Sequence, residues 1–395
     1  MKVRVREGDT YWYFSNLFNI PLPLLMDANR HLDPACLLMD DEIKIPGFKI
    51  KDYKIKKDDT FWKLALKNQI RVEILLYFNP GHEKKQLQIG DSIKLPIKVS
   101  DSSLMRMKKY TSEQLYEDIL KLEESFPFIE VQEVGKSVLG KSIPLLRIGK
   151  GKKKVLMNAS FHANEWITTA ILMDLVHEYV ITLTNNHQMR GINTFQLYNS
   201  VELTVVPMVN PDGVDLVLNG PIDEIRGKVS FINRGYFDFT HWKANINGVD
   251  LNNQYPAKWE VEKERKEPKV PAPRDYPGDD ILTEPEAKAM ADLAHNEMFH
   301  RMVAFHTQGK EFYWGYEGYE PSESKGIAEE FERVSGYKAI QYVDSHAGYK
   351  DWFIQEFKRP AFTLELGKGI NPLPLSQYEE IYRDVSGIFL AALYM

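Results

Sequence analysis

The sequence predicts an α/β protein, with a mixed, largely parallel sheet that carries helices on both faces and follows two small repeated βααβ units. Three observations predict this architecture. Strand-like apolar runs alternate with helical stretches, which is typical of parallel sheets covered on both faces. Titratable residues directly follow several of these runs, as expected where functional groups gather at the carboxyl ends of strands. An internal repeat predicts the small units.

Composition limits the class of protein. The 395 residues are too many for one average domain, and a content of 43% hydrophobic and 27% charged residues is ordinary for a globular protein. The net charge of −6 argues against nucleic acid as the main partner. Cys36 is the single cysteine, so no intramolecular disulfide is expected. No run of eighteen uninterrupted apolar residues occurs, so we expect no membrane span.

The first hundred residues repeat with an offset of fifty. Several short matches recur at this offset: residues 9–12 (DTYW) at 59–62 (DTFW), Asn29 at Asn79, and residues 41–46 (DEIKIP) at 91–96 (DSIKLP). In the second copy, a short strand is predicted near 53–56, a helix capped by Asp59-Thr60, a second helix over 72–78, and a closing strand at 93–96. Each unit is therefore expected to have the order βααβ.

This pattern resembles the LysM module, a family that binds N-acetylglucosamine-containing glycans such as peptidoglycan. The resemblance implies one LysM repeat over 1–48, a second over 49–98, and peptidoglycan glycan as a partner. The second copy has Asp58 where the family usually has glycine, which we expect to strain the turn without destroying the module. The alternative is that the repeats serve only as spacers or as a dimer surface.

A larger domain is expected over 105–395, after a polar linker near 99–103. A helix is predicted over 112–125, because Leu115, Ile119 and Leu122 are spaced for one helical face. Further along the chain the pattern predicts strands at 154–160, 201–208, 301–305 and 361–366, with intervening helices over 168–184 and 284–297.

Four titratable residues follow the predicted strands. His162 and Glu165 come after the first run, and their spacing places both on one face of a turn. His306 and Glu365 follow two later runs. Two histidines and one carboxylate are a typical ligand set for catalytic zinc, with the fourth position left to water, and a second carboxylate nearby can activate that water. Each residue alone is more often structural, but the set of four predicts a zinc hydrolase.

The same four residues resemble the zinc carboxypeptidase family. Further segments match that family in order along the chain, at 135–141, 209–213, 248–252 and 276–278. The resemblance covers roughly 110–395 and implies a carboxypeptidase-like fold. It also implies one zinc ion held by His162, Glu165 and His306, with Glu365 as the general base and later the acid for the leaving amine.

The chain departs from ordinary carboxypeptidases at two places. A family Trp-Arg pair that stabilises the oxyanion is here Trp242-Lys243, so Lys243 would act as a point charge; alternatively it is only a solvated surface lysine. The family's Asn-Arg pair is here Asn252-Asn253, and asparagine cannot grip a terminal carboxylate through a bidentate, charge-assisted contact. The second departure argues against an ordinary carboxypeptidase.

The segment 306–310 (HTQGK) resembles the bacterial γ-D-glutamyl-diamino acid peptidases within this family, which also carry LysM repeats. The resemblance implies hydrolysis of the γ-D-glutamyl-diaminopimelate bond of peptidoglycan stem peptides. A zinc carboxypeptidase for ordinary peptides and a non-catalytic peptidoglycan-binding protein remain as alternatives. Besides Lys243, the candidates for contact with substrate are Asn252, Asn253, Arg234, Lys310, Tyr342 and Tyr349.

The first residues of the chain bear on its cellular location. Residues 1–9 lack an apolar core and a small-residue cleavage site, so we expect no secretory signal and a protein that is cytoplasmic as synthesised. A substrate in peptidoglycan nevertheless favours association with a cell wall or a spore.

Overall fold

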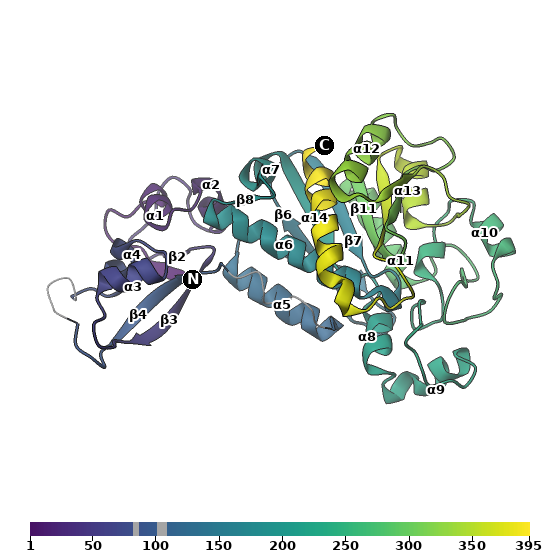
Figure 1. Ribbon diagram of the computed structural model, residues 1–395, viewed down its shortest axis with the longest axis horizontal. Helices are drawn as coiled ribbons and strands as arrows, with labels where there is room; N and C mark the ends of the chain where they lie inside the picture. Colours follow the sequence, from purple (N-terminus) through teal and green to yellow (C-terminus); the bar gives the residue numbers. More distant parts are fainter. Residues whose placement is uncertain (82–86, 101–108) are drawn as a thin grey trace. The chain divides into compact units, whose positions relative to one another are not determined.

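The computed structural model describes residues 1–81, 87–100 and 109–395 (Figure 1). Residues 101–103 of the predicted linker and the predicted domain start at residue 105 lie outside the described residues. The chain divides into two compact units. The first comprises Met1–Leu104, Ile119–Glu130 and His177–Phe195, and the second comprises Met105–Asp118, Val131–Val176 and Gln196–Met395.

Both repeats have the predicted βααβ order. The first contains β1 (Lys2–Arg4), α1 (Tyr11–Phe18), α2 (Leu22–Asp27) and β2 (Glu42–Lys44), and the second contains β3 (Phe48–Lys54), α3 (Phe61–Lys67), α4 (Val72–Phe78) and β4 (Ser92–Lys98). Within each repeat the two strands pair antiparallel.

The residues that recur at the fifty-residue offset have the same structural role in both copies. Thr10 and Thr60 cap α1 and α3 through their side-chain oxygens, which removes one unpaired N–H from each helix start. Asn29 binds the backbone of Lys44 through both ends of its side-chain amide, and Asn79 binds Lys94 in the same way. These buried amides join the second helix of each repeat to its closing strand.

Asp58 adopts the left-handed backbone conformation that the first copy assigns to glycine. Its φ is 66°, and that of Gly8 is 86°. Aspartate tolerates this region better than most residues that carry a Cβ. The turn is therefore kept in the second copy, as expected.

An eight-stranded sheet forms the centre of the second unit, with the strand order β13-β12-β14-β11-β7-β10-β6-β5. Strands β14, β11, β7 and β10 run parallel, and β12 and β6 pair antiparallel at the two sides of this parallel centre. The strands span β5 (Glu130–Lys136), β6 (Ser142–Ile148), β7 (Lys153–Ala159), β10 (Val201–Val206), β11 (Arg301–Thr307), β12 (Glu311–Tyr313), β13 (Lys338–Ile340) and β14 (Ala361–Leu366). The predicted mixed, largely parallel sheet is confirmed.

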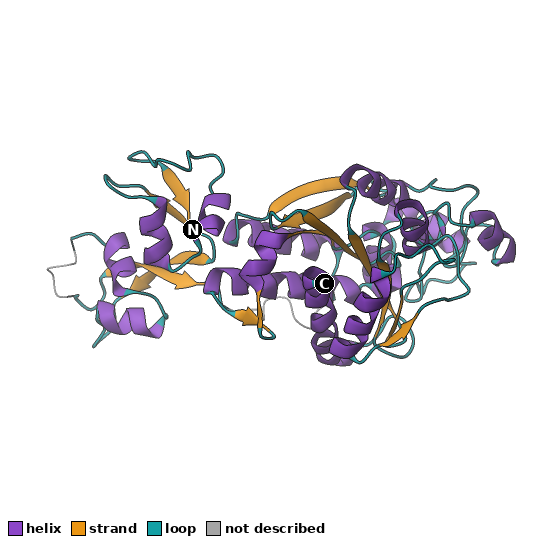
Figure 2. Cartoon of the chain, turned by 90° about the horizontal axis from the view of Figure 1, so that it is seen from above, coloured by secondary structure: helices purple, strands orange, loops and turns teal. Residues whose placement is uncertain are grey.

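Helices cover both faces of this sheet (Figures 1 and 2). Alternate strand side chains, such as Leu156 and Met302, pack in one core with α11 and α13. The side chains between them in the sequence point to the other face of the sheet, where Phe362 of β14 contacts Phe331 of α12. The helices and short elements not yet given are α5 (Ser112–Ser125), α6 (Ile167–Asn185), β8 (Gln188–Met189), β9 (Ile192–Asn193), α7 (Thr194–Ser200), α8 (Pro211–Asn219), α9 (Asp223–Ile232), α10 (Trp259–Arg265), α11 (Pro285–Glu297), α12 (Glu323–Ser335), α13 (Tyr349–Phe357), α14 (Tyr378–Tyr394), and the 3₁₀ turns η1 (Ala163–Glu165), η2 (Leu251–Asn253) and η3 (Leu375–Gln377).

Helix α6 is the one helix in the described ranges that is long and apolar enough to cross a membrane. However, 94% of its most apolar window is buried inside the molecule. Such burial is what a core helix of a large α/β sheet requires, since it is covered by protein on all sides.

Candidate metal centre and active site

Three neighbouring strands deliver the site residues to the same edge of the sheet. Strand β7 ends at Ala159, after which His162 precedes the turn η1 and Glu165 ends it. Strands β11 and β14 lie side by side in register, so that His306 is directly opposite Glu365. Because paired residues of adjacent strands point to the same face, β11 and β14 bring these two side chains together without any contribution from loops.

The three predicted metal ligands converge on one point. The Nδ1 atoms of His162 and His306 lie 3.1 Å apart. One Glu165 carboxylate oxygen lies 2.8 Å from Nδ1 of His162 and the other lies 3.0 Å from Nδ1 of His306. All three residues are buried, and their ligand atoms lie within 4.8 Å of one another. Buried lone pairs that face each other at this distance need a proton or a cation between them, and the donor set suits zinc.

A buried charged pair supports the first histidine from behind. Nε2 of His162 lies 3.2 Å from Oδ1 of Asp250, which leaves Nδ1 directed at the centre. The other Asp250 oxygen lies 3.0 Å from Nζ of Lys243, and Asp275 lies 3.6 Å from the same Nζ. Burial lowers the pKa of Lys243, but the charges of Asp250 and Asp275 outweigh it and raise this pKa above its usual range. Lys243 is therefore a fixed cation and not a solvated surface lysine.

The centre opens into a cavity of about 360 Å³. Glu365 lines it together with His162 and Glu165, two of the three predicted metal ligands. Burial and the charge of Glu165 raise the pKa of Glu365 well above its usual range, with Lys243 acting in the opposite direction. A carboxylate whose pKa is raised is a stronger proton acceptor than an ordinary surface carboxylate, as a general base requires. The remaining lining residues are Asn164, His241, Lys243, Arg274, Thr307, Gln308, Tyr313, Gly369, Ile370 and Asn371.

Several residues of the site are not marked by any motif in the sequence. Arg274 and His241 stand in irregular segments, and Tyr313 lies on the short strand β12. Asn371 donates from its side chain to the carbonyl of Thr307. Asp250 belongs to a family segment that the sequence had marked, but its contact with His162 spans 88 residues. No spacing rule along the chain could have paired them.

The structure corrects the prediction that Tyr349 contacts substrate. This side chain is fully buried, and its hydroxyl donates to the carbonyl of Met290 in the core. The other candidate, Tyr342, is exposed and donates to Glu320, and it does not line the cavity.

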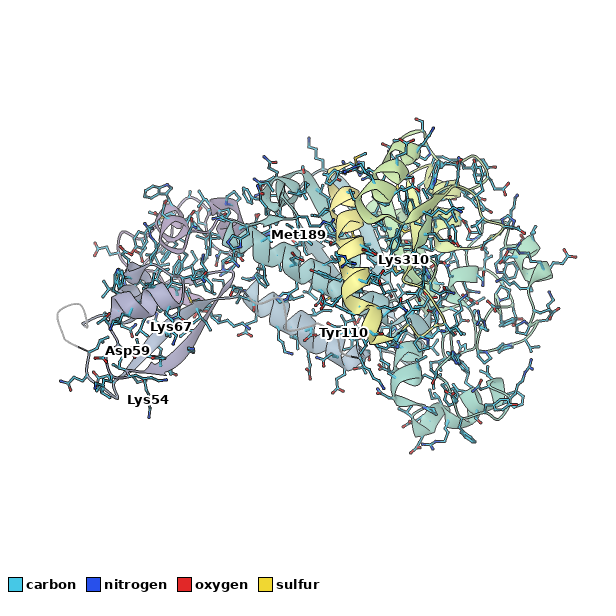
Figure 3. The ribbon with its side chains drawn as sticks, viewed as in Figure 1. Lys54, Asp59, Lys67, Tyr110, Met189 and Lys310 are labelled. Carbon is cyan, nitrogen blue, oxygen red and sulfur yellow. The ribbon has the colours of Figure 1, made fainter. Side chains whose placement is uncertain are left out.

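The remaining substrate-binding candidates also lie outside the lining of this cavity. Lys310, labelled in Figure 3, pairs with Glu380 and Asp384 of α14 at 2.7 and 2.9 Å. Asn252 accepts a hydrogen bond from the backbone N–H of Tyr349, and Asn253 is buried. Arg234 lines a neighbouring cavity. Two of these side chains are thus occupied by structural contacts, and contact with substrate stays a prediction for the set.

Known proteins match the chain over the same regions as these features. The pattern of a family described as zinc carboxypeptidase matches residues 115–385, which include the four convergent residues. The chain belongs to the zinc carboxypeptidase family. Members of this family are zinc peptidases, and this chain is a peptidase of that family. Residues 3–46 and 53–96 match the LysM domain, which agrees with the two repeats.

Individual zinc carboxypeptidase relatives extend the comparison. A protein of Lysinibacillus sphaericus named gamma-D-glutamyl-L-diamino acid endopeptidase 1 is 47% identical to this chain. The match covers 100% of this chain and 100% of that protein. An uncharacterized protein of Bacillus subtilis strain 168, YqgT, is 44% identical over 86% of this chain and 94% of its own. A crystal structure of thrombin activatable fibrinolysis inhibitor superposes with a TM-score of 0.58 at 18% identity, covering 74% of this chain and 78% of that one. The last match shows a shared fold.

Proposed function

We propose that this chain hydrolyses the γ-D-glutamyl bond to diaminopimelate in the stem peptides of peptidoglycan, using one zinc ion per chain. One observation carries the proposal. His162, Glu165 and Glu365 line a single cavity in a chain that matches a named γ-D-glutamyl-L-diamino acid endopeptidase over its whole length. The two LysM matches support a substrate within the wall. Asn253 supports it as well, because it replaces the arginine that holds the chain end in ordinary carboxypeptidases.

Six residues of the site have a defined task in the proposed reaction. His162, Glu165 and His306 would hold the zinc ion, which supplies a Lewis acid and lowers the pKa of water. Asp250 keeps the His162 ring in its orientation. Glu365 takes the proton of the attacking water and passes it to the departing amine of the diamino acid. Lys243 is a fixed positive charge beside the centre and offsets negative charge that develops on the scissile carbonyl oxygen.

The test uses the zinc-loaded full chain and the tripeptide L-Ala-γ-D-Glu-meso-diaminopimelate. We expect free diaminopimelate and L-Ala-γ-D-Glu, identified by mass spectrometry. Glu365→Gln is the matched control, and it should bind zinc normally and lose turnover by about 10²- to 10⁴-fold. Failure to cleave the tripeptide would contradict the proposal. Release of the last residue from an all-L peptide instead would identify an ordinary carboxypeptidase.

We further propose that the LysM repeats hold the enzyme at a cell or spore wall. Trp12 and Trp62 occupy equivalent positions in the two copies and expose 69% and 67% of their surfaces. Neither indole is needed for a core, and an exposed indole offers a flat amphipathic face for a ligand. These two residues are our candidates for glycan contact.

A further inference from the structure

Among the described residues that line the cavity, Arg274 is a cation with unused hydrogen-bonding capacity. Lys243 is enclosed by Asp250 and Asp275. Arg274 lines the same cavity, and its Nε donates to Asp275 at 2.8 Å. Within the described ranges, its two terminal amino groups have no partner, and its side chain is 60% exposed. Because the guanidinium is held at Nε, its two terminal amino groups point in a fixed direction. Two parallel N–H groups in one plane are the geometry that binds both oxygens of a carboxylate.

Backbone contacts fix Arg274 on one side of the metal centre. The amides of Lys243 and Ala244 both donate to the carbonyl of Pro273, at 2.8 and 2.9 Å. The carbonyl of Lys243 in turn accepts from Ala163 of η1, the turn that follows β7. Arg274 is thereby attached to the β7 side of the centre.

Glu365 lies on the opposite side of the same centre. It belongs to β14, and β11 with His306 lies between β14 and β7. Because Glu365 passes its proton to the departing amine, the amine fragment lies on the β14 side. The acyl fragment therefore lies on the side of Arg274.

The chemistry of the proposed substrate supplies a ligand for that position. In a γ-glutamyl amide the scissile carbonyl is at the end of the glutamate side chain, and the α-carboxylate of the same residue is free. An ordinary α-linked peptide has no such carboxylate on its acyl fragment. We propose that Arg274 binds the free α-carboxylate of the γ-linked glutamyl residue and thereby selects γ-linked over α-linked substrates. This inference rests on the proposed function of the same site.

The experiment compares two substrates that differ at this carboxylate alone. One is L-Ala-γ-D-Glu-meso-diaminopimelate, and the other carries an α-carboxamide on the glutamyl residue. The wild-type chain should prefer the carboxylate by about 10- to 100-fold in kcat/KM, as expected for a hydrogen bond between charged groups. Arg274→Gln should lose this factor on the carboxylate substrate and leave the carboxamide substrate unchanged. Arg274→Lys should restore part of the preference, since it keeps the charge without the fork.

Arg226 provides the matched control. It is also an exposed arginine that pairs with a nearby aspartate, Asp223, but it lies on α9 and does not line the cavity. Arg226→Gln should keep the full preference for the carboxylate. An Arg274→Gln variant that keeps the preference, or that slows both substrates equally, would overturn the inference and leave the proposed function intact. Cleavage of neither substrate by the wild-type chain would overturn both.

Discussion

Asp250 is a residue on which two parts of the site depend. It is fully buried and contacts both His162 and Lys243. Burial raises the pKa of Asp250, but the charges of Lys243 and His162 outweigh it and bring this pKa well below its usual range. The carboxylate therefore stays ionised. It orients His162, one of the predicted metal ligands, and compensates the buried cation at the same time.

Replacing Asp250 with asparagine should weaken metal binding. The amide cannot accept from the His162 ring as strongly, so we expect the metal affinity to fall by about 10- to 100-fold, as is typical when a partner behind a ligand is lost. Titration against a competing chelator measures this change. Asp275→Asn is the control, because Asp275 contacts Lys243 but has no contact with His162 in the described part of the chain. Equal affinities for the wild type and Asp250→Asn would exclude the orienting role.

A second buried carboxyl group, Glu286, links stability to pH. Burial raises its pKa from 4.5 to about 7, and hydrogen bonds from Val138 and Asn245 lower it only in part. The folded chain then keeps a proton that the unfolded chain releases. The contribution of Glu286 to the free energy of unfolding should therefore be largest below about pH 4.5. It should fall as the pH rises to about 7.

Glu286→Gln should remove this pH dependence. The neutral amide has nothing to ionise, so the variant should gain on the order of 3 kcal/mol relative to the wild type between pH 4.5 and pH 8. Urea denaturation at the two pH values measures the difference. If both proteins lose the same stability over this range, Glu286 is not the group responsible.

At the scale of elements, the sheet aligns the site and α8 holds it in place. Asn210 caps α8 by accepting from the Gly213 amide, and its side chain also donates to the carbonyls of Phe161 and Ala244. A Cβ at Gly213 would lie 2.7 Å from the Asn210 side chain and 2.8 Å from that of Ala163. Helix α8 thus packs directly against η1, the turn that carries Glu165. The sequence had marked 209–213 as a family segment, but this packing was not predictable from it.

Gly213→Ala should disturb that packing. We expect it to cost about 1–3 kcal/mol in stability, as overpacking usually does, and to lower metal affinity because η1 is pushed away from β11. Thermal denaturation and zinc titration test the two effects. Gly227→Ala is the control in α9, where an added Cβ meets nothing within 4 Å and should be neutral or mildly stabilising. Similar results for both variants would argue against a close contact between α8 and η1.

At the scale of the whole molecule, the chain combines two LysM repeats with a zinc carboxypeptidase domain. The proposed division of labour is that the repeats bind glycan and the cavity cleaves peptide. Under this proposal, insoluble peptidoglycan binds to both the LysM repeats and the cavity, whereas a free tripeptide binds to the cavity alone. The two activities can therefore be separated by substitution without removing any segment.

The double variant Trp12→Ala, Trp62→Ala should bind insoluble peptidoglycan about tenfold more weakly or worse, as is common when exposed aromatic contacts are truncated. It should cleave the soluble tripeptide at the wild-type rate. Sedimentation with purified wall measures the first effect. Leu66→Ala in α3 is the control, since Leu66 is similarly exposed at 65%. Unchanged wall binding by the double variant would exclude the two indoles.

The sequence by itself determined several elements of this protein and the residue types that the structure brings together at its centre. Hydrophobic periodicity is a local property, so it predicted the βααβ order of both repeats, β14 at 361–366, and α5 over Ser112–Ser125. Residue type and position after strands predicted His162, Glu165, His306 and Glu365, because parallel strands that end at one edge bring distant residues together.

Only the tertiary structure decided which further side chains belong to the site. Asp250 contacts His162, and Arg274 lines the cavity, through packing between segments far apart in the chain. Such packing leaves no periodic trace in the sequence. Tyr349 has the residue type of a substrate ligand, but the packing of α13 against α11 places it in the core. Residue type states what a side chain is able to do, whereas burial and orientation, which arise when the whole chain packs, decide whether it does so.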